Sequence, residues 1–376
     1  MPPRRILLPQ VTPRDRLNLD DERIRARFAI VESEEQRPDG VFGSSDATAR
    51  VAAETADRLG LPGPGLAAFM RCHDKLTCRE VGARAVPEAT PRFAAVDTAA
   101  PPAEPPLPLP FFLKPARAHL SQHASRIDSA DGFRAAAEAA AAEGFTRLIA
   151  EELLDGALVT FEGFVAGGAV TTIGVTDAVL HENGISFMRF EYPSRLPAHT
   201  TAAMNSVAER LMPALGFDQS LFNMEFFVTP RGVQVVEVNG RVASQFGPLV
   251  RAVHGVSTYE IGLDLAAGGS PILPPARPGR FAASFVQRTW QDARVIALPD
   301  MERVHAQFPD AVVEVLVRPG QRLSENDDDP LSHRLCTAAL SADGHDQLLE
   351  RWARLEPLLD FKLDQNKEEH QATRSA

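Results

Sequence analysis

Apolar and polar positions along this chain follow two different periods. Apolar residues spaced three to four positions apart predict helices, whereas short β-branched or aromatic runs bounded by Gly and Pro predict strands. The helices expected on this basis span residues 47–59, 65–81, 131–143 and 200–215. The expected strands span 6–8, 111–115, 148–154, 159–165, 170–176 and the two arms of a hairpin over 222–241. Strands mixed with helices and joined in antiparallel hairpins favour an α+β fold.

Two proline-rich stretches divide this pattern into lobes. Residues 87–110 favour an extended, semi-rigid connector, and residues 271–278 precede alternating strands and helices that run to about residue 361. We therefore expect a short N-terminal lobe over 1–80, a lobe over 81–156 that includes the connector, a lobe over 157–270, a C-terminal αβ segment over 271–363 and a polar, disordered tail over 364–376.

Composition excludes some classes of function. At 376 residues and 44% apolar content, the chain is long enough to bury a sizeable core. The net charge of -11 argues against a general nucleic-acid binder. The cysteines show no paired metal spacing, and their scarcity fits a reducing cytoplasm. Because no run of about 18 apolar residues and no secretory signal is present, we expect a cytoplasmic protein with no membrane partner.

The most informative segment is a predicted hairpin that brings two acidic residues face to face. Two β-rich runs flank the three-residue loop 230–232, which ends in Gly, where a left-handed conformation is usual. Pairing of Thr229 with Val233 then sets Glu225 directly opposite Glu237. Like charges directly opposite one another destabilise a sheet, so we expect a cation between them.

A metal site competes here with an exposed hairpin whose charges are solvated. The surrounding residues are almost continuously apolar, which favours buried strands, and acidic groups in such strands rarely lack a partner. Glu237, Asn239 and Arg241 share one face because side chains alternate along a strand. Two carboxylates and an amide oxygen suit Mg²⁺ that also holds substrate phosphates. We therefore interpret Glu225, Glu237 and Asn239 as metal ligands.

Five short motifs follow one another along the chain. They are Asp74-Lys75, Lys114-Pro115, Glu151-Glu152-Leu-Leu-Asp-Gly156, Glu225 with Glu237 and Asn239, and Arg241. Their order resembles the ATP-grasp superfamily. The resemblance runs from about residue 41 to residue 361, and Glu-x11-Glu-x-Asn-x-Arg is its most specific part. Within the superfamily the chain is most similar to the L-amino acid ligases, or dipeptide synthetases, notably over 161–165 and 173–177.

The resemblance implies an ATP-grasp fold, in which the nucleotide is held between two α+β lobes. It implies an ADP-forming acid–amino-acid ligase that activates a carboxylate as an acyl-phosphate and joins it to an amine, giving an amide or dipeptide, ADP and phosphate. The implied cofactors are ATP and Mg²⁺, as one or two ions, with Mn²⁺ as a substitute. The implied partners are small-molecule carboxylate and amine substrates, and a homodimer is left open.

The resemblance also implies a role for each matching residue. Arg241 and Lys114 would be catalytic, because phosphoryl transfer depends mainly on positioning and charge neutralisation. Lysines would reach the nucleotide phosphates as point charges, and the edge of a strand would hold the adenine. The implied ATP-binding residues are Lys75, Lys114, Ser121, Glu151, Glu152, Leu153 and Leu154. Taken singly, each of these residues also fits a solvated helix face or a strand end.

Some positions depart from the pattern of the superfamily. The phosphate-covering loop over 116–124 lacks its usual glycines, Leu158 stands where an acid usually binds ribose, and Asn223 replaces a histidine. These departures leave two alternatives open: a degenerate ATP-grasp protein that binds a ligand or partner without turnover, and a ligase for carboxylates other than amino acids. Residues 187–190 predict an apolar pocket, with Arg189 or Arg195 free to bind a carboxylate.

Overall fold

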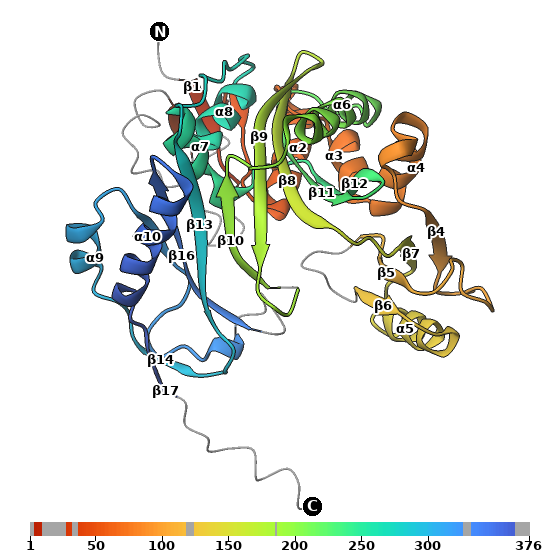
Figure 1. Ribbon diagram of the computed structural model, residues 1–376. Helices are drawn as coiled ribbons and strands as arrows, with labels where there is room; N and C mark the ends of the chain where they lie inside the picture. Colours follow the sequence, from red (N-terminus) through yellow and green to blue (C-terminus); the bar gives the residue numbers. More distant parts are fainter. Residues whose placement is uncertain are drawn as a thin grey trace, which may run out of the picture. The chain divides into compact units, whose positions relative to one another are not determined.

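A computed structural model describes residues 4–9, 28–31, 37–117, 124–184, 186–325 and 332–364 (Figure 1). The chain divides into two units, each assembled from several segments. Unit 1 comprises residues 1–177, 194–247 and 256–274, and unit 2 comprises residues 178–193, 248–255 and 275–376. Within the described residues, no helix is long and apolar enough to cross a membrane.

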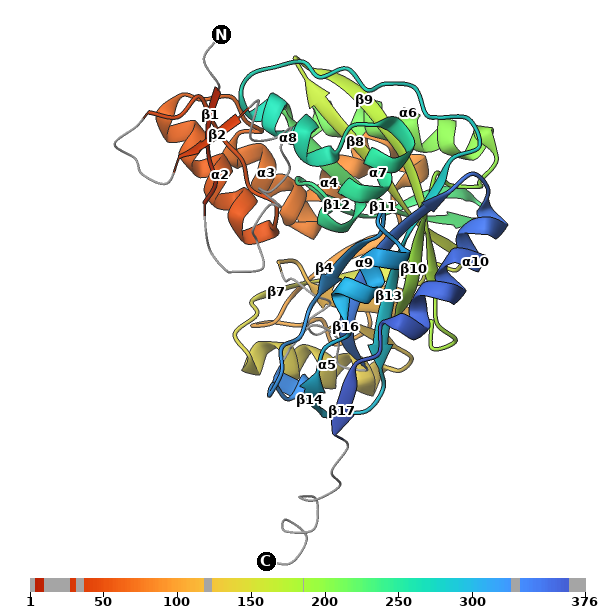
Figure 2. The same cartoon turned by 90° about the vertical axis from the view of Figure 1, so that its left-hand side faces the viewer.

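Unit 1 begins with a small parallel sheet followed by three packed helices (Figure 2). The expectation of a single helix over 65–81 is wrong, because the chain breaks at Asp74. Asp74 adopts an extended backbone, and its side chain accepts the amide of Thr77 at 3.0 Å, so it caps a new helix. In sheet order the strands are β2 (Phe28–Val31), β1 (Arg4–Leu7) and β3 (Gly40–Val41); the helices are α2 (Asp46–Leu59), α3 (Leu66–His73) and α4 (Lys75–Ala85).

The second sheet of unit 1 is antiparallel and carries one helix on its face (Figure 1). Phe111 and Phe133 meet edge to face in the core between that helix and the sheet. The stretch over 87–110 is not a plain extended connector, because it contains the short helix η2 (Pro87–Ala89) and the first strand of this sheet. The sheet order is β4 (Phe93–Asp97), β7 (Arg147–Glu152), β5 (Phe111–Pro115) and β6 (Ser125–Ile127), and the helix is α5 (Ala130–Ala142), capped by Ser129.

A third, antiparallel group of strands in unit 1 contains the predicted hairpins. Phe161, Phe222 and Phe226 are fully buried in its core, against apolar side chains of α4 and of a long helix. The strand order is β12 (Gly232–Asn239), β11 (Ser220–Thr229), β8 (Ala157–Ala166) and β9 (Ala169–Leu180). The remaining helices are α6 (Ala198–Ala214), η3 (Ser244–Phe246) and α8 (Thr258–Ala266).

Unit 2 contains a further antiparallel run of strands with helices against it. Phe285 stacks on Trp352 with ring centroids 4.4 Å apart, which fastens α10 to the strands (Figure 1). The strands are β10 (Phe187–Tyr192), β13 (Phe281–Thr289), β16 (His333–Ala342) and β15 (Val312–Val315), with the pair β14 (Arg294–Ala297) and β17 (Lys362–Asp364). The helices are α7 (Gly247–His254), α9 (Met301–Gln307), η4 (Leu323–Glu325), α10 (His345–Leu355) and η5 (Glu356–Leu358). The α+β class predicted from the sequence is confirmed.

Candidate functional site

The hairpin of β11 and β12 sets Glu225 opposite Glu237, which confirms the predicted pairing. The predicted loop is wrong, because Thr229 pairs with Gly232 and only two residues lie between them. The ladder shifts by one residue between Glu225 and Phe226, where Val236 is left without a partner. This β-bulge restores the register that faces one acid with the other.

The two acids of the hairpin have different surroundings. Lys75 Nζ lies 2.9 Å from Glu237 Oε1, and 30% of the Glu237 side chain is exposed. Glu225 is half-buried and makes no hydrogen bond or ion pair with any residue that the structure describes. Burial, followed by the charge of Glu237, raises the pKa of Glu225 above its usual range. An added cation would therefore stabilise the charged form of both carboxylates.

A chain of side-chain amides orients Asn239. Its Nδ2 donates to Oδ1 of Asn223 at 3.3 Å, and Nδ2 of Asn223 donates in turn to the carboxyl of Glu162. Because the nitrogen of Asn239 is engaged in this way, its oxygen remains for a cation. Burial raises the pKa of Glu162 to about 8, although its hydrogen bond from Asn223 opposes that shift.

Glu151 lies buried between two cations. Its Oε1 is 2.6 Å from Nε of Arg79, and its Oε2 is 2.6 Å from Nζ of Lys114. Burial opposes the ionisation of Glu151, but the charges of Arg79 and then Lys114 hold its pKa below its usual range. Arg79 also donates to the carbonyl of Val236 at 2.6 Å, so it joins α4 and β7 to the bulge.

The sequence analysis missed Arg79, although its spacing gave a usable signal. Arg79 lies four positions after Lys75, which places both side chains on one face of α4. Its partner, Glu151, comes from β7 and lies far along the chain. Helical spacing could therefore have nominated Arg79, but the sequence could not have supplied its partner.

At the strand end that was predicted to hold adenine, two arginines donate hydrogen bonds to one of the predicted residues. Glu152 accepts from Arg92 at 3.1 Å and from Arg231 at 2.8 Å. Strand β7 ends at Glu152, and Leu153 and Leu154 follow it as irregular chain. The adenine-binding role of these residues stays a prediction.

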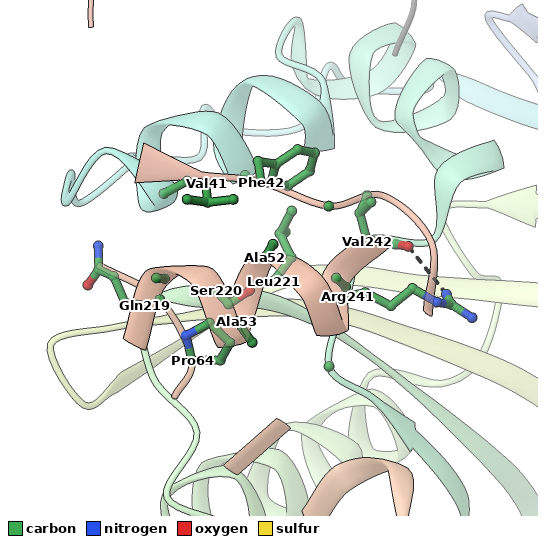
Figure 3. A pocket seen from close by; sticks show the side chains of 17 residues that line it. Val41, Phe42, Ala52, Ala53, Pro64, Gln219, Ser220, Leu221, Arg241 and Val242 are labelled. Atoms are coloured by element: carbon green, nitrogen blue, oxygen red, sulfur yellow. Dashed lines mark hydrogen bonds between the residues drawn. The ribbon is translucent and has the colours of Figure 1, made fainter. Parts of the chain in front are cut away.

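Arg241 pairs with an acid that the sequence analysis did not nominate. Its Nε donates to Asp46 Oδ1 at 2.5 Å, and its Nη2 donates to Asp46 Oδ2 at 3.3 Å. Its Nη1 donates to the carbonyl of Val242 at 3.3 Å, the bond drawn in Figure 3. Asp46 is the first residue of α2, so a helix from the N-terminal part of unit 1 fixes the side chain of Arg241.

Beside Arg241 lies a cavity of about 30 Å³ lined mainly by small and apolar side chains. Figure 3 shows the guanidinium of Arg241 directed away from Ala52, Ala53 and Leu221. A space of this volume holds about one water molecule rather than a substrate. The charged end of Arg241 is thus turned away from this cavity.

Other predicted residues have mixed outcomes. Ser121 lies outside the described residues. Arg117, which lies in the glycine-poor loop over 116–124, pairs with Asp74 at 2.7 Å. Arg189 is not free, because its Nε donates to the buried carboxylate of Glu191 at 2.7 Å in unit 2. Arg195 also has partners, since its backbone amide donates to Asp177.

A family model described as an ATP-grasp domain matches residues 107–248. Residues 107–248 therefore resemble an ATP-grasp domain. The matched residues include Lys114, Glu151 and the whole β11–β12 hairpin, which confirms the resemblance drawn from the motifs.

The comparisons with known proteins agree on the ATP-grasp fold. Carnosine synthase 1 of Gallus gallus is 32% identical over 122 residues, a match that covers 32% of this chain and 13% of that protein. The structure of an L-amino acid ligase from Bacillus licheniformis matches with a TM-score of 0.72 and 18% identity, over 87% of this chain and 81% of that chain. The biotin carboxylase domain dimer of the 2-oxoglutarate carboxylase of Hydrogenobacter thermophilus, solved with MgADP, matches with a TM-score of 0.67 and 13% identity, over 96% and 85% of the two chains.

The donor set of the ATP-grasp hairpin fits a magnesium ion. Among the residues that the structure describes, no three His, Cys, Asp or Glu side chains are grouped to hold a metal. The hairpin offers two carboxylates and one amide oxygen, and Mg²⁺ commonly takes one or two carboxylates together with substrate phosphates and water. Glu225 has no hydrogen-bond or ion-pair partner among the described residues, and Glu237 pairs with an ammonium, so this site favours positive charge.

Proposed function

We propose that this protein is an ADP-forming, ATP- and Mg²⁺-dependent ligase that joins a carboxylate to an amine. The observation that carries the proposal is a pair of lysines held by acids within unit 1. Lys75 lies 2.9 Å from Glu237, and Lys114 lies 2.6 Å from Glu151. Both lysine side chains are mostly buried, so each has a restricted orientation.

The chain's own residues would divide the work as follows. Lys75 and Lys114 bind the phosphates of ATP. Without ATP, the neighbouring carboxylates pair with these two lysines. Glu225, Glu237 and Asn239 hold Mg²⁺, which neutralises charge on the phosphates when it is bound. Arg241 faces the transferred phosphoryl group, where fixed donors lower the barrier most. Ser121 and the strand end at Glu151–Leu154 complete the nucleotide site.

The reaction balances with ATP and two small-molecule substrates. An oxygen of the carboxylate attacks the terminal phosphorus, the bond from that phosphorus to ADP breaks, and an acyl-phosphate forms. The nitrogen of the amine then attacks the carbonyl carbon. Phosphate leaves with its bonding electrons and the nitrogen loses a proton, which gives an amide.

We further propose that the amine is an amino acid, so that the product is a dipeptide or a related amide. The similarity to an L-amino acid ligase structure and the 32% identity to part of carnosine synthase 1 support this substrate class.

Phosphate release from ATP tests this function. The protein is incubated with ATP and Mg²⁺ against pooled amino acids and small carboxylic acids, and phosphate is measured. We expect release that requires two added compounds. Glu237→Gln should keep its fold but lose about 100-fold or more of that activity, because a neutral amide is a weaker Mg²⁺ ligand than a carboxylate and carries no charge to attract Lys75.

Glu88→Gln is the matched control. Glu88 also pairs with a basic residue, Arg210, but on an exposed surface, so this variant should keep full activity. Full activity of Glu237→Gln would contradict the metal assignment. Tight ATP binding by the wild-type protein with no phosphate release in any pool would favour a module that binds without turnover.

A further inference from the structure

The guanidinium of Arg241 is held by Asp46 and by one backbone carbonyl. Asp46 accepts from Nε and Nη2, the side-on edge of the guanidinium, and the carbonyl of Val242 accepts from Nη1. An arginine has five N–H donors, and these three bonds leave one donor on each Nη nitrogen. Nη1 and Nη2 border the end-on edge of the guanidinium, and no residue that the structure describes accepts from their two remaining donors.

That remaining edge has the geometry of an oxyanion clamp. Two parallel N–H groups match the oxygens of a carboxylate or phosphate and bind them bidentately. About a fifth of the side chain is exposed, at 22%, so a ligand can reach it. The end-on edge therefore points to a phosphoryl group or an acyl-phosphate as its ligand class.

Asp46 is itself rigidly placed. It opens α2, whose first turn is fixed by a reciprocal cap in which Ser45 Oγ accepts from the Thr48 amide at 3.2 Å and Thr48 Oγ1 accepts from the Ser45 amide at 2.9 Å. His73 of α3 adds a second neighbour, with Nε2 3.9 Å from Asp46 Oδ1 and its ring 4.2 Å from that of Phe69. Residues of two helices, α2 and α3, therefore position the Asp46 carboxylate, and both helices precede the ATP-grasp match.

We propose that Asp46 is the positioning residue of Arg241, fixing its side-on edge so that its end-on edge binds the oxyanion of the reaction. This inference rests on the proposed ligase function. Arginine has many rotamers, and a fixed carboxylate on one edge selects a single one before substrate arrives. The competing account is that the ion pair only fastens α2 to the chain after β12.

The test separates these accounts with Asp46→Asn, Arg241→Lys and the double variant. Inorganic phosphate is titrated by calorimetry into protein saturated with MgADP, and the kcat of the best substrate pair is measured beside it. We expect Asp46→Asn to weaken phosphate binding and lower kcat about 10-fold each, with MgADP affinity unchanged. In the Arg241→Lys background, Asp46→Asn should add no further loss, because its whole effect passes through the guanidinium. Asp46→Glu should restore part of kcat.

Asp131→Asn is the matched control, since Asp131 also lies in the first turn of a helix and pairs with an arginine, Arg134. It should leave phosphate binding and kcat unchanged. Additive losses in the double variant, or a lower melting temperature of Asp46→Asn with normal phosphate binding, would reduce Asp46 to a structural role. Phosphate binding needs no turnover, so absence of ligase activity with an intact phosphate site would overturn the proposed function and leave the positioning by Asp46 standing.

Discussion

At the level of single residues, the candidate site depends on neutral hydrogen bonds as well as on charges. Glu162, Asn223 and Asn239 form a line of buried side chains in which each amide nitrogen donates to the next oxygen. Asn223 stands where the resemblance led us to expect a histidine, and it supplies both a donor and an acceptor to the line. The oxygen of Asn239 is thereby left as the acceptor for a cation.

Replacement of Asn223 by Leu should weaken the proposed metal site without touching a metal ligand. The Mg²⁺ concentration needed for half-maximal phosphate release should rise about 10-fold, as expected when a residue that orients a ligand is lost. The variant should also lose stability, because the buried carboxyl of Glu162 is left without its hydrogen bond. Both are measured by Mg²⁺ titration and by urea denaturation.

Asn205→Leu provides the comparison. Asn205 also bonds two side chains, those of Thr172 and Glu209, but on α6. Its replacement should leave the Mg²⁺ requirement unchanged. An unchanged requirement in Asn223→Leu as well would show that Asn239 needs no such orientation.

The sequence identified residues whose role follows from their type and order, and missed those whose role follows from a distant contact. Lys75, Lys114 and Glu237 were nominated by motif order, and the structure brings each against a partner of opposite charge. Asp46 was missed because nothing near it in sequence shows that Arg241, 195 positions away, will reach it. For Arg79 of α4, helical spacing gave a signal, but its partner Glu151 lies in the distant strand β7 and could not be foreseen.

At the level of elements, the hairpin shows why a correct pairing can rest on a wrong turn. Alternation of side chains predicted that Glu225 faces Glu237, and it does. The loop was predicted one residue too long, and the bulge at Val236 makes up the difference. A bulge depends on its surroundings, here the carbonyl of Val236 held by Arg79, so local sequence does not reveal it. The helix break at Asp74 was missed because Asp74 fits a helix face as well as a cap.

The β7–β8 turn requires glycine at position 156, because the turn packs closely against β11. A Cβ placed there would lie 2.2 Å from the carbonyl oxygen of Val228, a backbone atom of β11 that cannot turn aside. Gly156→Ala should therefore push β8 from β11 and destabilise the protein by about 1–3 kcal/mol. Urea denaturation measures this, and the Mg²⁺ requirement should rise with it because β11 carries Glu225.

Gly132→Ala makes the same chemical change in α5. Its Cβ would meet only the Ser129 hydroxyl at 3.2 Å, a side-chain atom, and Ala is the better helix former by up to about 1 kcal/mol. Gly132→Ala should be neutral or slightly stabilising. Equal stability of the two variants would mean that the β7–β8 turn has room that the structure does not show.

At the level of the whole molecule, chain connectivity makes the C-terminal part hard to remove. Unit 2 contains residues 178–193 and 248–255 as well as everything after residue 275. Strand β10, from the first of these segments, pairs with β13 from the last, along Arg189 to Tyr192. The C-terminal αβ segment predicted over 271–363 therefore shares its sheet with a strand from the middle of the chain. The lobe boundaries drawn from the proline-rich stretches stay predictions.

Truncation after Pro274 should for this reason fail to give a well-folded ATP-grasp fragment, although it keeps the whole matched range of 107–248. The cut removes β13, so β10 keeps its buried residues Phe190 and Tyr192 but loses the pairing with β13 along one edge. An apolar strand with an unpaired edge promotes aggregation. We expect an insoluble or oligomeric fragment, judged by light scattering and thermal melting. Truncation after Asp364 keeps every described element and should melt like the full chain. A soluble, monomeric fragment ending at Pro274 with a sharp melting transition would show that unit 1 folds alone and that β10 does not need β13.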